Sequence, residues 1–218
     1  SYKKNLNTNY RVKIDSALQT SKNYIQLTKP NDDLSYTNSL STNFNLEGYN
    51  INKLDDRLKV SLNFYQTNQE NEDNKTTPAV FPKVKYHTGY FNKYGNITHS
   101  TLEFYNIVRD KSTDVHAKNQ QKISHKYNIK KEIINYNSKI QIDAEIYNQF
   151  FNNENKYLGN DTYKTGSYYR LFPILGLSAE TPFRFKNNFR NLTINPKFHI
   201  VVSPGVSNSN KISNEDST

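Results

Sequence analysis

Residues 139–146 read Lys139-Ile140-Gln141-Ile142-Asp143-Ala144-Glu145-Ile146. Apolar side chains at the even positions alternate with polar or charged side chains at the odd positions. In a β-strand, successive side chains point to opposite faces of the sheet. A helix, with 3.6 residues per turn, would scatter the four apolar residues around its circumference. The segment is therefore predicted to be a strand with one apolar face and one charged face.

The same period of two recurs along the whole chain. It predicts about nine strands, separated by polar segments rich in Asn, Asp, Gly, Lys or Pro that predict turns. The expected strands are Tyr10–Asp15, Leu40–Leu46, Leu58–Phe64, Val84–Tyr90, Ile97–Val108, Val115–Ile129, Lys139–Ile146, Tyr168–Leu177 and Leu192–Val202. The expected turns are residues 20–33, 68–78, 92–96, 152–161 and 186–191. The strands recur at about twice the 8–12-residue spacing of soluble sandwiches, and no segment predicts a helix.

The composition favours a membrane barrel over a soluble domain. Only 34% of the 218 residues are hydrophobic, and the mean hydropathy is -0.91. Such values fit either a disordered chain or a wide barrel whose apolar residues form an outer band around a wet interior. The 17 Tyr and 12 Phe argue against disorder. We therefore expect an all-β fold, the antiparallel wall of an incomplete transmembrane β-barrel. Because the chain starts at Ser1 without a signal segment, we expect residues 1–218 to be a fragment.

The sequence carries no recognisable chemistry. There is no Cys, and the catalytic motifs of hydrolases, zinc proteases and nucleotide-binding loops are missing. Asp143 and Glu145 share one strand face, but a wet barrel interior explains them more simply than paired catalytic carboxylates do. The net charge is +9, yet Lys and Arg share strands with Asp and Glu and form no basic stripe. We expect no enzyme activity, no metal, no cofactor and no nucleic-acid partner.

Prolines mark several strand ends. Pro82 is expected ahead of a strand, where the missing N–H is tolerated. Downstream, Arg170-Leu-Phe-Pro173 is followed by Pro182, by the Leu192–Pro204 segment that contains Pro196, and by Lys211 to Ser217. Because each proline removes one ladder donor, these positions are expected at bulges, rims or openings of a barrel.

These marked ends resemble the barrel domain of the LPS-assembly protein family LptD (OstA), closest to its alphaproteobacterial members. Those barrels carry an Arg-x-x-Pro strand, a proline strand end, a Leu-Thr-Pro strand ending in Ser-Pro, and an Ile-Pro-Asn-Glu-Asp-Ser loop. The positions similar to these motifs are Arg170 and Pro173, Pro182, Pro196, and Asn214, Glu215, Asp216 and Ser217. Asn195 precedes Pro196 and Ser213 stands in a usual Pro position, which are two departures. Upstream, Leu58–Pro82 is similar to a strand–loop passage, and Arg109 to the Arg of a strand end.

The resemblance implies a function in lipopolysaccharide (LPS) transport. It implies a barrel in the outer membrane of a Gram-negative bacterium, plugged by an LptE-like lipoprotein and fed by an LptA-like periplasmic bridge. One strand face would contact membrane lipid (Ile140, Ile142, Ala144, Ile146) and the other a polar lumen (Gln141, Asp143, Glu145). Two alternatives remain open at this stage: another outer-membrane barrel, such as a TonB-type receptor or a porin, and a secreted all-β binding protein.

Overall fold

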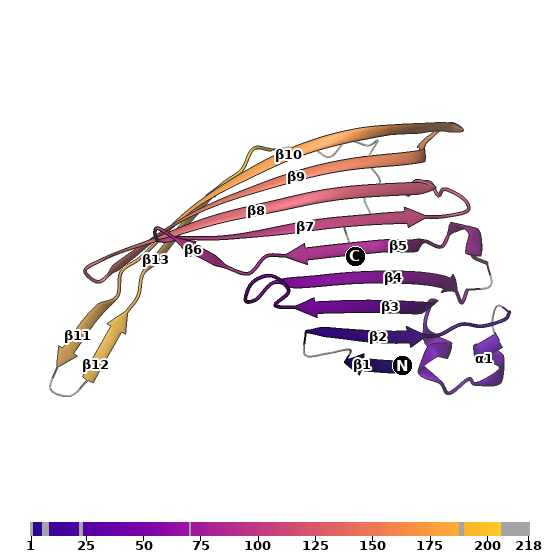
Figure 1. The fold of residues 1–218 in the computed structure, drawn as a ribbon, viewed down its shortest axis with the longest axis horizontal. Coiled ribbons are helices and arrows are strands. Elements are labelled where there is room, and N and C mark those ends of the chain that lie inside the picture. The colour runs from indigo at the N-terminus through magenta and orange to yellow at the C-terminus, as the bar shows by residue number, and fades with distance from the viewer. Residues whose placement is uncertain (1, 6–8, 22–23, 70, 188–189, 206–218) are drawn as a thin grey trace.

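A computed structural model of the chain describes residues 2–5, 9–21, 24–69, 71–187 and 190–205, which form almost only strands (Figure 1). The strands are β1 (Tyr2–Asn5), β2 (Tyr10–Ser16), β3 (Ser39–Tyr49), β4 (Arg57–Thr67), β5 (Ala79–His87), β6 (Phe91–Lys93), β7 (Asn96–Val108), β8 (Asn119–Asn135), β9 (Ser138–Gly159), β10 (Thr162–Glu180), β11 (Phe183–Asn187), β12 (Arg190–Ile194) and β13 (Lys197–Val202). The helical elements are α1 (Tyr24–Thr28) and the 3₁₀ turns η1 (Asp33–Tyr36) and η2 (Asn74–Thr76). No helix in this described part is long and apolar enough to cross a membrane.

The main sheet is an antiparallel meander. Ten of its 11 strands follow the order β1-β2-β3-β4-β5-β7-β8-β9-β10-β13, and the eleventh, β6, pairs with β7. β11 and β12 form a separate two-stranded sheet. The sheet curves but does not close within the described residues, so β1 and β13 lie at its two edges (Figure 1). The predicted all-β, antiparallel barrel wall is thus confirmed as an open wall.

The connections gather at two ends of the sheet. One end, here called the hairpin end, carries the connections 50–56, 94–95 and 136–137 and the β11–β12 hairpin, and it lies on the left in Figure 1. The opposite loop end carries the connections 17–38, 68–78, 109–118 and 160–161. α1 and both 3₁₀ turns belong to the loop end, within segments 20–33 and 68–78 or next to them. The expectation of no helix was therefore wrong for a few short turns, whose ordering depends on contacts between loops.

Several predicted boundaries were wrong, and strand length is the main reason. Residues 152–161 were expected to be a turn, but β9 continues to Gly159 and only residues 160–161 turn. The Asn-rich sequence there lacks an apolar alternation because barrel strands outside the lipid band need no apolar face. β8 begins at Asn119 instead of Val115 and runs on to Asn135. The expected strand Leu192–Val202 is interrupted at Asn195 and Pro196, which separate β12 from β13.

Pro82 lies inside β5, not ahead of it. The pairing of β5 shifts by one residue between Val80 and Lys83, against both β4 and β7. Such a bulge is where a strand accommodates a residue without a backbone donor. Phe81, half exposed beside Pro82, packs near Phe64 of β4 with ring centroids 6.1 Å apart. The predicted link between prolines and bulges holds here.

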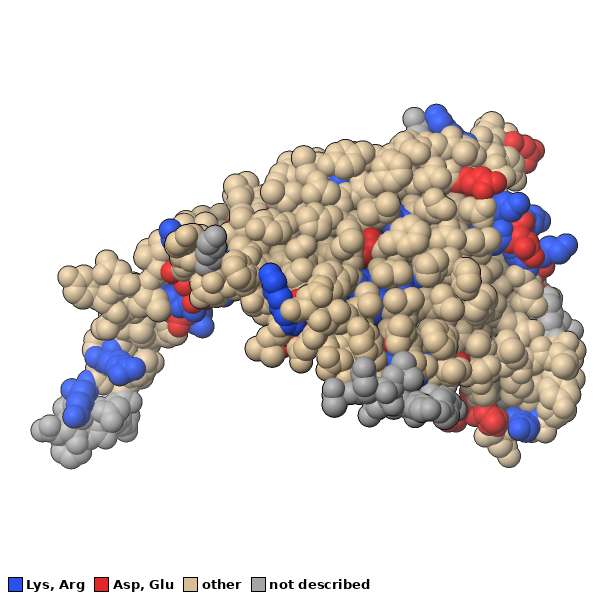
Figure 2. All heavy atoms as spheres, viewed as in Figure 1, with Lys and Arg blue, Asp and Glu red and all other residues tan. Residues whose placement is uncertain are grey.

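The outer face of the wall is apolar and exposed. On β9, Ile140, Ile142 and Ile146 are 37%, 44% and 41% exposed. The registers of β8 and β10 bring Ile129 and Leu175 beside Ala144 on the same face. Figure 2 shows uncharged side chains over almost the whole middle of this face, while charges gather near its ends. A soluble sheet would bury this face, so the exposed apolar band fits a wall surrounded by lipid.

Candidate functional site

The inner face of the wall carries the charges. On β9 the odd positions from Lys139 to Gln149 point to the side opposite Ile142, and on β10 the even positions from Arg170 to Glu180 pair with them. From Gly166 to Leu177 the residues of β10 alternate between partly buried even positions and exposed odd positions. The predicted division of β9 into an apolar set and a polar set is therefore confirmed. We assign the charged face to the barrel interior, because lipid does not accept unpaired charges.

Ion pairs on this face link side chains within strands and between neighbouring strands. They are Arg11–Glu47, Lys13–Asp15, Lys83–Glu103, Lys126–Glu145, Lys130–Glu132, Lys139–Glu132 and Lys197–Glu180. Most of these side chains remain between one fifth and one half exposed. The same face also carries Arg57, Lys59, Lys85, Lys122 and Arg170, so cations outnumber carboxylates there. The interior is a wet surface with a positive balance.

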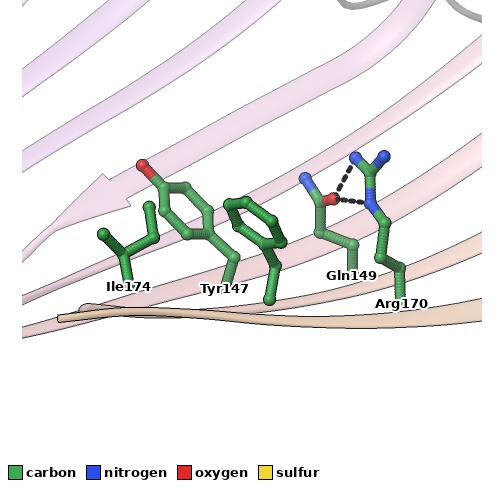
Figure 3. A pocket seen from close by; sticks show the side chains of 5 residues that line it. Tyr147, Gln149, Arg170 and Ile174 are labelled. Carbon is green, nitrogen blue, oxygen red and sulfur yellow. Dashed lines mark hydrogen bonds between the residues drawn. The ribbon is translucent and has the colours of Figure 1, made fainter. Parts of the chain in front are cut away.

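A pocket of about 290 Å³ lies on this face between β9 and β10 (Figure 3). It is lined by Tyr147, Gln149, Arg170, Phe172 and Ile174. Arg170 stands directly opposite Gln149, and its Nε donates to the Gln149 Oε1 at 2.7 Å. Phe172 stands opposite Tyr147, with ring centroids 6.4 Å apart and planes inclined by 57°. The pocket thus combines a positioned guanidinium with two aromatic rings.

A row of cation–π contacts continues from this pocket across the wall. The Arg170 Cζ lies 5.5 Å from the centroid of the Phe151 ring. The Lys122 Nζ lies 5.4 Å from the centroids of both Phe151 and Tyr105, and Lys122 is only 4% exposed. On the other side of the pocket, the Lys126 Nζ lies 4.8 Å from the Tyr147 ring centroid. These contacts with aromatic rings help to hold the three cations in place on the inner face.

A second pocket of about 330 Å³ lies near the hairpin end, where β9, β10 and β13 meet. Its lining is mostly polar and includes Gln141, Asp143, Ser178 and His199. The Asp143 carboxylate accepts a hydrogen bond through its Oδ2 from Gln141 Nε2 at 2.7 Å. No group of three or more His, Asp or Glu in the described part of the chain could hold a metal ion. Both pockets offer charge and hydrogen bonds for binding.

The motif residues chosen from the sequence fall into three places. Arg170 lines the first pocket, and Pro173 follows on the outer face of β10, opposite Ile146. Arg109 is 4% exposed at the loop end, where its Nη1 donates to the Ala117 carbonyl at 3.2 Å. Pro182 lies in the connection between β10 and β11, and Pro196 lies in the connection between β12 and β13, at the junction of the main sheet and the hairpin. Asn214, Glu215, Asp216 and Ser217 lie outside the described residues.

Sequence reasoning missed most of the pocket. Tyr147, Gln149 and Phe172 were not singled out, because each reads as an ordinary member of an alternating strand. The available signal was the even or odd position of each residue in its strand. By this rule Arg170 and Phe172 share one face of β10, and Tyr147 and Gln149 share one face of β9. Turning parity into a pocket requires the cross-strand register, which period alone does not give.

A buried carboxylate holds the hairpin end together. Asp56 is 1% exposed; its Oδ1 accepts from the Gly89 N–H at 2.6 Å, and its Oδ2 from the Lys53 N–H at 3.1 Å and the Tyr86 hydroxyl at 2.8 Å. The Gly89 N–H, helped by the Tyr86 hydroxyl and the Lys53 N–H, outweighs burial, which acts in the opposite direction, and so the pKa of Asp56 is lowered. A Cβ at Gly89 would lie 2.0 Å from the Leu54 carbonyl oxygen, so only glycine allows this approach.

A buried amide has the matching place at the loop end. Asn68 is fully buried, and its Nδ2 donates to the carbonyls of Thr37 at 2.9 Å and Leu34 at 3.3 Å. Its Oδ1 accepts from Gln19 Nε2 at 3.0 Å. The single side chain therefore joins the end of β4 to the long connection 17–38. Unlike Asp56, it carries no charge.

Comparisons with known proteins were made on the whole chain. The model of the family LptD, described as LPS transport system D, matches residues 1–218. A search of the curated proteins found no match. The family match covers every strand of the wall, both pockets and the β11–β12 hairpin.

Proposed function

Because the chain belongs to the LptD family of LPS transport proteins, we propose that its charged inner face lines the passage for the saccharide part of LPS. Membership gives the chain a role in LPS transport to the outer membrane of a Gram-negative bacterium. The proposal concerns which residues of this wall meet the cargo. The observation that carries it is the pocket of Arg170, Gln149, Tyr147 and Phe172 on a face where cations outnumber carboxylates.

The chemistry of the pocket suits a phosphorylated saccharide. A guanidinium binds phosphate oxygens with directed N–H donors, and Gln149 fixes the orientation of Arg170. Aromatic rings provide apolar surfaces that also accept the edge of a sugar ring, and Tyr147 adds a hydroxyl. Because most ion-paired side chains of the inner face remain partly exposed, cargo can exchange contacts with them as it moves.

We propose further that residues 1–218 are part of a larger barrel domain, and that the motif residues Arg109, Pro173, Pro182 and Pro196 shape its wall instead of contacting cargo. An LptE-like plug and an LptA-like periplasmic bridge are the proposed partners, on the support of family membership. A purely transporting role without catalysis is also proposed. It agrees with a family of transport and assembly proteins.

The test measures LPS transport by variants with matched charge loss. In the whole membrane protein, Arg170→Gln should lower the rate at which LPS appears in the outer leaflet several-fold, because the phosphate contact is lost. Lys131→Gln is the control, since Lys131 is exposed on the outer face of β8, opposite Ile142. Barrel content and heat-modifiability on gels should be unchanged in both variants. Equal transport by the two variants would contradict the proposed passage. So would a loss of transport that persists when position 170 carries another positively charged residue, as in Arg170→Lys.

A further inference from the structure

The β11–β12 hairpin extends beyond the wall at its lower left in Figure 1. Its register pairs Phe183 with Ile194 and Phe185 with Leu192 on one face. All four side chains are about half exposed, at 50%, 49%, 56% and 55%. The opposite face pairs Arg184 with Thr193, and Lys186 lies on the same side. The hairpin is therefore an amphipathic ribbon with an apolar face and a cationic face.

The apolar face of the hairpin continues the lipid-facing surface of the wall. Leu177 and Ala179 of β10 face outward, and the same odd parity continues to Phe183 and Phe185. On the returning strand, Leu192 and Ile194 share the even parity of the outward-facing Phe198 and Ile200. The outward apolar positions of β10 run from Tyr169 to Ala179, about the 9–11 residues with which a strand crosses a bilayer. The hairpin thus begins where the hydrocarbon layer ends.

Two prolines give the hairpin an orientation of its own. The ladder between β10 and β13 ends at the Glu180–Lys197 pair and resumes only at Phe183–Ile194. Between these pairs lie Pro182 and Pro196, neither of which has a backbone donor. The Thr181 N–H donates to the Pro196 carbonyl at 3.4 Å, Asn195 Nδ2 donates to Glu180 Oε1, and the Thr181 hydroxyl is hydrogen-bonded to the Ser138 hydroxyl at 3.0 Å. The regular main-chain ladder is therefore interrupted at this junction, where side-chain bonds replace it.

The hairpin is unsupported by the rest of the described chain. β11 and β12 are hydrogen-bonded only to each other, and neither packs extensively against another element. An isolated two-stranded ribbon is marginally stable at best in water. Exposed Phe, Leu and Ile side chains on one continuous face mark a surface that another phase or partner covers.

Charge and position identify the covering phase. Residues 181–196 contain Arg184, Lys186 and Arg190 but no Asp or Glu, and blue side chains follow the hairpin in Figure 2. A cationic, aromatic, amphipathic segment favours an anionic lipid surface. The other connections at this end, 50–56, 94–95 and 136–137, are shorter than most at the loop end. Short turns mark the periplasmic side of outer-membrane barrels, so the surface is the phospholipid of the periplasmic leaflet.

We propose that the β11–β12 hairpin lies in the periplasmic membrane interface, with Phe183, Phe185, Leu192 and Ile194 at the acyl-chain boundary. Arg184 and Lys186 on its other face bind anionic phospholipid headgroups. The hairpin thereby anchors the rim of the wall next to the edge strand β13. A protein that covers the same face is the competing occupant, and the experiment separates the two.

The experiment places the photo-cross-linking residue p-benzoylphenylalanine at Phe185 in the whole membrane protein. The protein is reconstituted into vesicles of phosphatidylethanolamine with one quarter phosphatidylglycerol. Leu175, on the outer face of β10, is the lipid-facing control position, and Phe172, on the inner face, is the control that should not meet bilayer lipid. After irradiation, position 185 should gain the mass of a phospholipid, as position 175 does and position 172 does not.

A second arm tests the headgroup contact. Arg184→Gln with Lys186→Gln should lower the phosphatidylglycerol adducts at position 185 several-fold and leave those at position 175 unchanged. Protein adducts alone, or no adduct, at position 185 beside a normal lipid adduct at position 175 would overturn the hairpin proposal and leave the passage proposal intact. Absence of lipid adducts at position 175 as well would contradict the outward assignment of the wall, and the hairpin proposal with it. Equal adducts in the charge-neutralised variant would overturn the headgroup contact.

Discussion

The wall and its two rims are stabilised in different ways. In the wall, the inner side chains form many ion pairs that stay partly exposed, such as Lys126–Glu145, whose side chains are 33% and 19% exposed. At the rims, single polar residues with almost no exposed surface each hold three groups of other residues. Asp56 does this at the hairpin end and Asn68 at the loop end. Stability is spread out in the wall and concentrated at the rims.

This difference follows from what each region has to do. A passage lining must offer its charges to a moving ligand, so its side chains cannot be fully committed to each other. A rim must keep neighbouring turns at a fixed spacing, so that the strands between them stay in register. Buried polar groups do this well because an unpaired partner in the interior is costly. Single substitutions are therefore expected to have large effects at the rims and small effects in the lumen.

The largest effect is expected for Asp56→Ala. The substitution removes three hydrogen bonds to a buried carboxylate and leaves the Gly89 and Lys53 N–H groups without their acceptor, a cost of about 3–5 kcal/mol in the free energy of unfolding. Urea unfolding in detergent micelles measures it. Asp143→Ala is the matched wall variant, expected to cost below about 1 kcal/mol because the Asp143 carboxylate is only partly buried. Equal costs would remove the distinction between wall and rim.

The stability that the buried polar residue contributes should depend on pH at the hairpin end but not at the loop end. The pKa of Asp56 is lowered in the folded state, chiefly by the Gly89 N–H. A carboxylate with a lowered folded pKa stabilises the fold above its unfolded pKa, and this contribution is lost as the pH falls through the folded pKa. Wild type should therefore exceed Asp56→Asn in stability at neutral pH, and the gap should narrow in acid.

The loop end supplies the control for this pH profile. Asn68 does not titrate, so the cost of Asn68→Ala, about 1–3 kcal/mol for its lost hydrogen bonds, should not follow the narrowing seen for Asp56→Asn. Unfolding midpoints of the three proteins between neutral pH and pH 3 give both profiles. A gap for Asp56→Asn that stays constant over this range would show that the Asp56 charge does not stabilise the hairpin end.

The sequence was sufficient for the class of fold but not for the assembly of the pocket. The alternation seen at Ile140, Ile142 and Ile146 recurs in β2, β3 and β4, and this repetition made the two-faced wall predictable. Register is different, because the pairing of β9 with β10 shifts twice near the loop end. Extended unchanged from the Gly159–Thr162 pair, the ladder would set Arg170 opposite Phe151; the two shifts set it opposite Gln149. These irregularities lie in the Asn-rich part of β9, where no apolar face fixes the pairing.

The same reasoning explains which rim features escaped prediction. Asp56 and Asn68 look like ordinary turn residues in a chain rich in Asp and Asn. Their burial arises only when neighbouring turns meet, as when Gly89 approaches the 50–56 connection. Pro182 and Pro196 were noticed because a proline alters the backbone wherever it stands. A proline can be interpreted from the sequence because its own ring restricts the backbone. The role of Asp56 or Asn68 depends on contacts with other segments, and these contacts can be predicted only once the strand register is known.

The smallest effect is expected for the Lys126–Glu145 pair of the lumen. Its Nζ and Oε2 atoms lie 2.8 Å apart, but both side chains keep contact with solvent, and such pairs contribute about 0–1 kcal/mol. Lys126→Gln, Glu145→Gln and the double variant form a thermodynamic cycle whose coupling should stay below about 1 kcal/mol. A larger coupling energy would mean that the charged side chains of the inner face bind each other as strongly as the buried polar residues at the rims bind their partners. With a small coupling, each charge of the pair can leave its partner at little cost, as a surface that exchanges contacts with a passing phosphorylated saccharide requires.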